Sequence, residues 1–159
     1  MIRTLALMVA TALPAAAQDV ADMMPRDGWV VTRTAMPFDG LVAAIRDAAA
    51  ANGLAVVTQA GPTGAAARRG IAIPGNRVLG LFNNDLAVRL LQASTPAMSE
   101  APMRVYVTEN ADGTATLSYE PPSVVLAPYA SDASDPGTVQ AIGADLDAAF
   151  TAIAVEVAR

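Results

Sequence analysis

The side chains that could do chemistry in this chain are few, because its 159 residues include no His, no Lys and no Cys. An imidazole base, a thiol nucleophile, a disulfide, a lysine Schiff base and the lysine of a phosphate-binding P-loop are therefore excluded. Soft-metal sites are excluded with them, since these sites need Cys or His ligands. What remains are carboxylates, tyrosines, asparagines and arginines, which can exchange protons or hold a ligand.

Polar residues within predicted strands or just after them are the candidates for a ligand site. They are Asn83, Asn84, Arg104, Tyr119 and Glu120. Arg104 offers a planar fork that binds anions, and Tyr119 and the two asparagines would line one end of a sheet. These residues also have a purely structural interpretation: a packed tyrosine, asparagines that cap the next helix, and a surface arginine. No catalytic residue, metal ligand or cofactor is predicted.

No pair of carboxylates stands out as an acid and a base. Glu109 and Glu120 each end a strand of one hairpin, but they lie at its opposite ends. Asp132 and Asp135 share a loop, yet two carboxylates are too few for a hard-metal site. The glycine-rich segment 61–70 matches neither the G-x-G-x-x-G pattern nor a P-loop, so a flexible surface loop is expected there.

The composition limits the class of protein. Lys+Arg is 10 and Asp+Glu is 15, so the formal net charge is −5 and the pI is about 4.5. Nucleic-acid partners are not expected, because phosphate binding needs a basic face. The length suits one domain. Hydrophobic residues make up 53% of the chain, and many are Ala, so the core must be built largely from small side chains.

The first 17 residues have the form of a secretory signal peptide. A short positively charged start precedes an uncharged apolar run, and Ala15 and Ala17 are the small residues expected before a cleavage site. Cleavage between Ala17 and Gln18 would give a periplasmic or secreted protein. No stable membrane anchor is expected, because the apolar run is shorter than the roughly 20 residues of a membrane span. The alternative is an ordinary buried N-terminal helix. The predicted organisation is a signal peptide (residues 1–17), a flexible lead-in (18–27) and a single α+β domain (28–159).

Alternating and helical patterns predict the elements that must position the candidate residues. Strands are predicted at residues 28–36, 54–59, 71–73, 78–82, 103–109 and 114–120, the last two forming an antiparallel hairpin. Helices are predicted at residues 38–52 and 85–92, and after Asp135, which is a good N-cap before Pro136. Residues 123–129 are expected to be extended. The C-terminal helix carries an apolar stripe that should pack on the sheet, formed by Val139, Ile142, Leu146, Phe150, Ile153 and Val157. Gly143 inside this helix favours close packing.

Two predicted strands show which side chains share a face. In the strand at 103–109, Met103, Val105 and Val107 alternate with Arg104, Tyr106 and Thr108. In the first strand, Trp29, Val31 and Arg33 lie opposite Val30, Thr32 and Thr34, and either face could be the buried one.

Several of these segments together resemble the domain-of-unknown-function family 302. The resemblance rests on residues 77–82, on the strand Ala-Pro-Met-Arg-Val-Tyr-Val-Thr-Glu ending at Glu109, and on Asp112-Gly113, Leu117-Ser118-Tyr119 and Asn52-Gly53-Leu54. It implies an α+β fold: an antiparallel sheet of about four to six strands, with a long C-terminal helix and a shorter helix packed on it. This layout is similar to that of TATA-binding-protein-like folds, without a DNA role. The resemblance also implies a possible homodimer, and it brings no assigned reaction.

Two functions fit these observations. The first is an exported, non-catalytic domain that binds an unknown small molecule or a protein partner, favoured by the missing His, Lys and Cys. The alternative is a hydrolase or isomerase that uses carboxylates and Tyr. That alternative predicts a concave site with at least two acidic groups about 5–9 Å apart.

Overall fold

A computed structural model describes residues 20–159 of the chain. The predicted signal peptide and its cleavage site lie outside the described residues. Within residues 20–27, the backbone N–H of Ala111 donates to the Asp22 carboxylate over 2.8 Å, and Arg33 lies 3.4 Å from the same carboxylate. Asp22 therefore ties this N-terminal segment to Arg33 and to the turn that contains Ala111.

The described residues form one antiparallel five-stranded sheet in the order β1-β5-β4-β3-β2. The strands are β1 (Val30–Arg33), β2 (Ala55–Ala60), β3 (Asn76–Phe82), β4 (Met103–Glu109) and β5 (Ala115–Tyr119). The predicted hairpin is confirmed, since β4 and β5 pair directly and Val107 lies opposite Leu117. The predicted strand at residues 71–73 is wrong, because that segment has no strand geometry.

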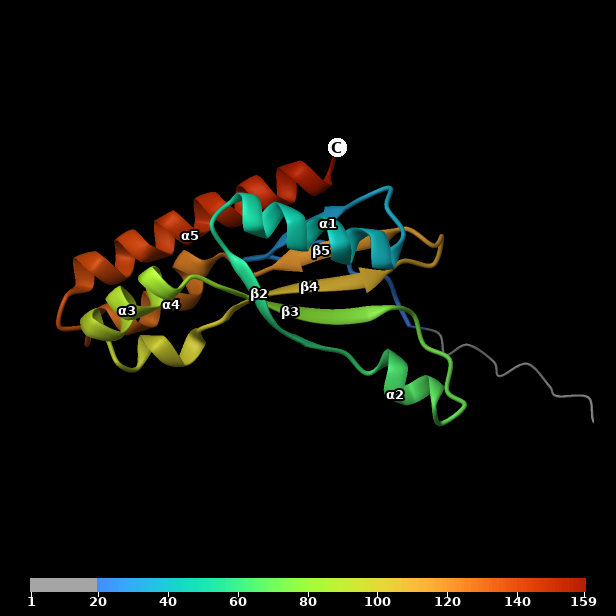
Figure 1. Cartoon of the computed structure of the whole chain (residues 1–159), viewed down its shortest axis with the longest axis horizontal. Coiled ribbons are helices and arrows are strands. Elements are labelled where there is room, and N and C mark those ends of the chain that lie inside the picture. Colours follow the sequence, from blue (N-terminus) through green and yellow to red (C-terminus); the bar gives the residue numbers. More distant parts are fainter. Residues whose placement is uncertain (1–19) are drawn as a thin grey trace, which may run out of the picture.

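The helices are α1 (Phe38–Ala51), α2 (Thr63–Ala67), α3 (Asn84–Ala93), the 3-10 helix η1 (Ala97–Glu100), α4 (Pro122–Ala130) and α5 (Pro136–Val157). Helices α1 and α5 cover one face of the sheet, whereas α2 projects away from them (Figure 1). Helices α1 and α5 pack against each other, and α1 contacts β4 and β5. The α+β prediction, with a long C-terminal helix and a shorter one on an antiparallel sheet, is confirmed.

The C-terminal helix α5 supplies much of the core. All six residues of its predicted apolar stripe are buried, and Phe150 is among the largest side chains in the interior. Among the described helices, α5 is the one long and apolar enough to cross a membrane by length and composition. A helix whose apolar stripe is buried against a sheet meets the same test, so its packing on the sheet accounts for that composition.

The segment at residues 123–129, predicted to be extended, is instead helix α4. The β-branched Val124 and Val125 have a low helix propensity, but tertiary packing against α5 overrides that local preference. Pro122 lies in the first turn, where its fixed φ suits a helix. The Asp147 carboxylate accepts a hydrogen bond of 3.0 Å from the Ser123 N–H and so satisfies a free donor at the helix start.

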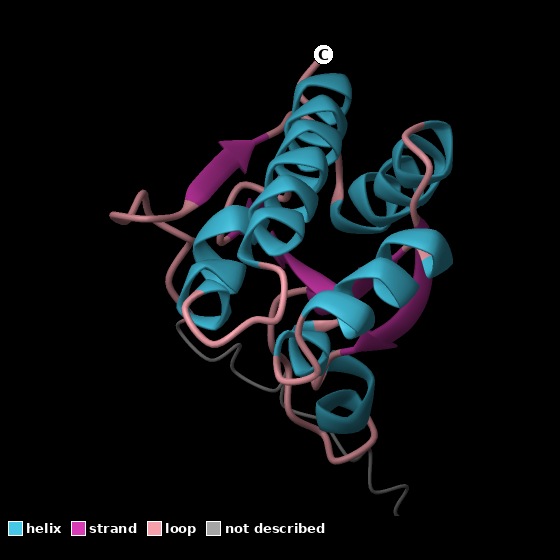
Figure 2. Cartoon of the chain, turned by 90° about the vertical axis from the view of Figure 1, so that its left-hand side faces the viewer, coloured by secondary structure: helices cyan, strands magenta, loops and turns pink. Residues whose placement is uncertain are grey.

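Gly143 brings α4 and α5 into close contact. A Cβ at this position would lie 2.9 Å from the Cα of Ser123, so only glycine fits without a backbone shift. The close packing expected at Gly143 is therefore present. Helices α3, η1 and α4 gather beside the N-terminal half of α5, and Figure 2 views the molecule from this end.

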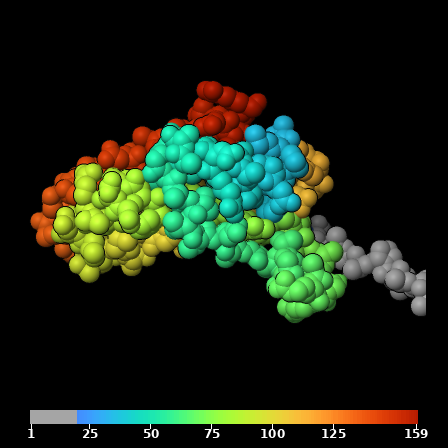
Figure 3. All heavy atoms as spheres, viewed as in Figure 1, coloured from blue at the N-terminus to red at the C-terminus, as the bar shows by residue number. Residues whose placement is uncertain are grey.

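Residues 61–70, predicted to be a flexible loop, contain the short helix α2. In the space-filling view of Figure 3, this green segment projects from the rest of the body. Its position is tied to the sheet, because the hydroxyl of Thr63 donates to the carbonyl of Pro74 over 3.2 Å.

Candidate functional site

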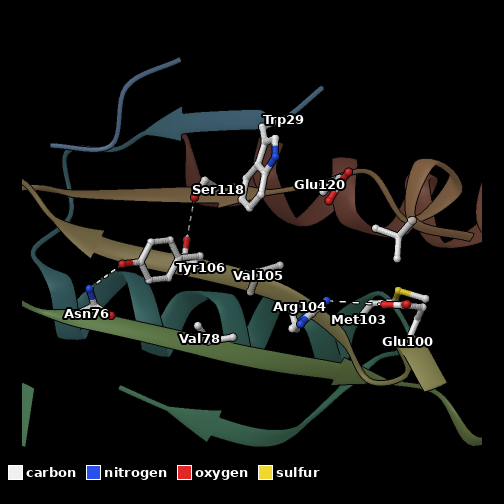
Figure 4. A pocket seen from close by; sticks show the side chains of 11 residues that line it. Trp29, Asn76, Val78, Glu100, Met103, Arg104, Val105, Tyr106, Ser118 and Glu120 are labelled. Carbon is white, nitrogen blue, oxygen red and sulfur yellow. Dashed lines mark hydrogen bonds and ion pairs between the residues drawn. The ribbon is translucent and has the colours of Figure 1, made fainter. Parts of the chain in front are cut away.

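Strand alternation separates the two faces of the sheet and places a groove on one of them. On β4, Val105 and Val107 point into the helix-covered core and are at most 1% exposed. Arg104 and Tyr106 point to the opposite face, where they line a groove of about 560 Å³. The floor of the groove comes from β3, β4 and β5. Figure 4 shows the groove with Trp29 reaching over it from the start of β1.

Apolar side chains form most of the walls. They are Trp29, Val78, Tyr106 and Val125, the last of these from α4. Trp29 shares its face with Val31, which pairs with Ser118 on β5, so this face of the first strand looks onto the groove. Ser118 is fully buried beneath these side chains even though it lies on the groove side of the sheet. The walls therefore offer a ligand a mostly apolar, partly aromatic surface.

Tyr106 is held in place by a side-chain hydrogen bond and divides the groove from a second cavity. The Asn76 amide donates to the Tyr106 hydroxyl oxygen over 2.6 Å, and both residues line both cavities. The second cavity has a volume of about 190 Å³ and is also lined by Asp22 and Thr108. The Thr108 hydroxyl is buried and has no hydrogen-bond partner among the described residues.

The charged residues gather at the end of the groove near η1 (Figure 4). Arg104 lies 3.7 Å from the Glu100 carboxylate, whose other oxygen accepts a hydrogen bond from the hydroxyl of Tyr129. That hydrogen bond raises the pKa of the Tyr129 phenol above its ordinary value. Glu120 also lines the groove and makes neither an ion pair nor a side-chain hydrogen bond among the described residues.

Two of the five predicted site residues come together in this groove. Arg104 and Glu120 are in neighbouring regions of its lining, on β4 and just after β5. The alternative interpretation of Arg104 as a surface residue also fits in part, because its side chain is 68% exposed. Arg104 is thus both reachable from solvent and positioned to touch a bound molecule.

The two asparagines lie outside the groove, and Asn83 has a structural role. The Asn83 carboxamide oxygen accepts from the N–H of Leu86 over 2.9 Å, and its amide donates to the carbonyl of Gly53 over 2.9 Å. Asn83 is therefore the N-cap of α3. Asn84 is exposed in the first turn of the same helix. Neither residue contributes to the groove lining.

Tyr119 also belongs to the structure rather than to the groove. It is 3% exposed on the helix-covered face, with its ring edge-on to Phe150 at a centroid distance of 5.2 Å. Burial raises the pKa of its phenol. The packed-tyrosine interpretation is the one that the structure supports, because side chains alternate along β5 and Ser118, not Tyr119, faces the groove.

Glu109, weighed as one half of a carboxylate pair, is engaged with the backbone. Its carboxylate accepts from the N–H of Gly75 over 2.6 Å, and it lines the second cavity rather than the groove. Glu109 and Glu120 are thus in separate cavities. Within residues 20–159, no group of three or more Asp or Glu residues is placed to hold a metal ion.

Sequence reasoning missed nine of the eleven residues that line the groove, among them the four residues Trp29, Asn76, Tyr106 and Glu100. A signal existed for two of them, since Trp29 and Tyr106 each lay on a defined face of a predicted strand. Asn76 preceded the predicted start of its strand, and Glu100 lay between the predicted helix at residues 85–92 and the predicted strand at residues 103–109. No sequence pattern connected these last two residues to the groove.

Comparison with known proteins supports the fold. The chain is similar to a solved structure described as an uncharacterized conserved DUF302 protein from Bacillus stearothermophilus, with 16% sequence identity and a TM-score of 0.70. The match covers 83% of this chain and 99% of that one. No curated protein matches the chain. The family model described as domain of unknown function DUF302 matches residues 29–153, from Trp29 at the groove to Ile153 in α5. The chain therefore belongs to the DUF302 family.

Proposed function

We propose that this protein is a non-catalytic binding module that holds a small molecule in the groove on the open face of its sheet. The observation that carries the proposal is the groove itself, at about 560 Å³ and walled by Trp29, Val78, Tyr106 and Val125. Ligand pockets are commonly about 300–1,000 Å³, mostly apolar, with a few polar groups that fix orientation. Arg104, Glu100 and Glu120 supply such groups at one end.

Burial of apolar surface supplies the driving force for such binding. A planar or branched apolar ligand seated between Trp29 and Val78 would remove both from water, at about 25 cal/mol for each Å² of apolar surface covered. The hydrogen bond from Asn76 to Tyr106 fixes one wall before a ligand arrives, which lowers the ordering cost of binding.

Native mass spectrometry of the purified protein tests this proposal. We expect a retained small-molecule mass that is lost in Val78→Glu, which places a charge on the groove floor. The matched control is Val88→Glu on α3, because Val88 is 55% exposed and does not line the groove. A wild-type spectrum without ligand, together with no response of Trp29 fluorescence to added apolar probes, would contradict the proposal and direct attention to a protein partner.

The alternative, a hydrolase or isomerase, keeps one observation in its favour. Glu100 and Glu120 both line the groove, so two carboxylates share one concave site. This alternative predicts turnover of ester or glycoside substrates that disappears in Glu120→Gln while the fold is retained. Absence of turnover across such a panel, with a ligand still bound in the native spectrum, favours the binding module.

Export and assembly are further parts of the proposal. We infer that the protein acts in the periplasm or outside the cell after cleavage before Gln18, on the ground of the signal-peptide pattern in residues 1–17. Peptide mass analysis of the protein from a periplasmic fraction should then give Gln18 as the first residue.

We also infer a homodimer, because β2 leaves one edge of the described sheet unpaired and exposes Val57. A dimeric mass in the native spectrum would support this assembly, and a monomer at micromolar concentration would contradict it.

A further inference from the structure

We propose that the groove selects organic cations: molecules with an apolar, preferably aromatic body and one protonated or quaternary amine. This inference rests on the proposed function and names its ligand class. It is drawn from three features of the groove, which are the balance of its charges, the pairing of its arginine, and the aromatic rings beside its unpaired carboxylate.

The charges that line the groove favour a cation. Its charged residues are Glu100, Arg104 and Glu120, so carboxylates outnumber guanidinium groups by two to one. The chain as a whole has a formal net charge of −5, which also raises the local concentration of cations over anions. An anion entering the groove would meet the unpaired negative charge of Glu120, and like-charge contact disfavours the wrong ligand.

Arg104, the one cation among the charged residues of the described lining, already lies beside a carboxylate. Its guanidinium lies 3.7 Å from Glu100, which Tyr129 fixes by donating its hydroxyl hydrogen to the other carboxylate oxygen. An anionic ligand would have to compete with a carboxylate that is held in place. Glu120 is different, because it has no ion-pair partner among the described residues and is exposed at the groove. Glu120 is therefore the group that can accept a ligand ammonium at the smallest cost.

The aromatic walls are suited to the same ligand. A cation over the face of Trp or Tyr is attracted by the negative charge density of the ring. One face of Trp29 already carries such a cation, since the guanidinium carbon of Arg26 lies 4.8 Å from its ring centroid, so a ligand ammonium would use Tyr106 or the other face of Trp29. Trp29 and Tyr106 line the groove together with Glu120, as Figure 4 shows, so one ligand can meet both rings and the carboxylate.

The chain contains one Trp, so its intrinsic fluorescence reports directly on the groove. The test titrates the full protein with three probes of the same body: 4-phenylbutylamine, 4-phenylbutanol and 4-phenylbutyrate. At pH 7 they carry a positive charge, no charge and a negative charge. We expect saturable changes in Trp29 emission, with the amine binding at least about tenfold more tightly than the carboxylate and the alcohol between them.

Variants assign that preference to the groove. Glu120→Gln keeps the size of the side chain and removes its charge, so the tenfold preference should fall to about two- or threefold. The matched control is Glu156→Gln, since Glu156 is exposed on α5 and outside the groove lining. It should leave all three affinities unchanged. Circular dichroism of both variants should match the wild type.

The outcomes separate this inference from the proposed function. Equal affinities for amine and carboxylate, or a preference for the carboxylate, would overturn the cation inference while the groove remains a binding site. A preference for the amine that survives in Glu120→Gln would overturn the role assigned to Glu120. Failure of all three probes to alter Trp29 emission would contradict the proposed function itself.

Discussion

The two faces of the sheet are made from alternating residues of the same strands, yet they do different work. On β3, Leu79 is fully buried against the helices, whereas its neighbour Val78 lies in the groove. On β5, Tyr119 packs on Phe150, whereas the preceding residue, Ser118, faces the groove. One face holds the fold together, and the other is free to carry a ligand site.

This difference shows what an antiparallel sheet allows. Such a sheet can bury one face and leave the other to solvent, and an ordinary solvated face would be polar throughout. Here the second face carries Trp29, Val78 and Tyr106 around a cavity instead. Apolar side chains on an open face contribute little to the core, so their clustering is better explained by binding. Substitutions on the two faces test this separation of roles.

Truncation of neighbouring residues on β3 compares the two faces most simply. Leu79→Ala should lower the free energy of unfolding by about 2–5 kcal/mol, because it opens a cavity in the buried face. Val78→Ala should lower it by less than about 1 kcal/mol and should weaken ligand binding instead. Urea denaturation monitored by circular dichroism measures both. Equal losses of stability would show that the groove face is part of the core.

The contact between α4 and α5 provides a second test, which concerns the buried core and not the groove. Gly143→Ala should destabilise the protein by about 1–3 kcal/mol, since its Cβ would lie 2.9 Å from the backbone of Ser123. Gly137→Ala in the first turn of the same helix is the matched control, because its Cβ meets no atom closer than 3.5 Å. That control should be neutral or slightly stabilising. Thermal melts of the two variants distinguish them, and equal melting temperatures would contradict the close packing.

Substitution of the two adjacent asparagines should distinguish the residue that caps α3 from the one that is only exposed. Asn83→Ala should cost about 1 kcal/mol, because it removes the hydrogen bond to the Leu86 N–H at the start of α3. Asn84→Ala should change stability by less than about 0.5 kcal/mol, as expected for an exposed position. Neither should alter ligand binding in the groove. A loss of binding in either variant, measured by Trp29 fluorescence, would mean that the site extends beyond the groove.

The smallest expected effect is the response of Asp112 to acid. Hydrogen bonds from Thr114 and Arg33 lower the pKa of this carboxyl to about 2, from an ordinary value of 3.8. Because the folded-state pKa is depressed, the stabilisation is present above about pH 4 and is lost as the pH falls towards 2. Carbon-13 NMR of the carboxyl should give a titration midpoint near 2. Arg33→Gln should raise this midpoint towards 3.8, and an unchanged midpoint would contradict the ion pair.

Much of the fold could be predicted from the sequence, because the relevant patterns are local. The alternation along residues 103–109 and the stripe from Val139 to Val157 predicted a strand and a helix, and both are present. Helix α4 could not be predicted, because its geometry depends on packing against α5 at Gly143, a contact between distant segments.

The groove was harder to predict than the fold, because it depends on which face the helices leave open. The sequence indicated that Arg104 and Tyr106 share a face, but not that this face is the open one. Glu120 was a candidate through its place at the end of a strand, and so was Tyr119 beside it. Only the three-dimensional arrangement separates them, since one lines the groove and the other packs in the core.

The most direct test of the account is a methyl NMR titration of valine-labelled protein with the tightest-binding phenylbutyl probe. Val78 and Val125 line the groove, whereas Val107 and Val157 lie in the core beneath the other face. Binding on the open face should give saturable shifts for the Val78 and Val125 methyl signals, with little change for the Val107 and Val157 signals. Shifts confined to the two core valines, or no saturable shift at any of the four, would contradict the assignment of binding to the open face.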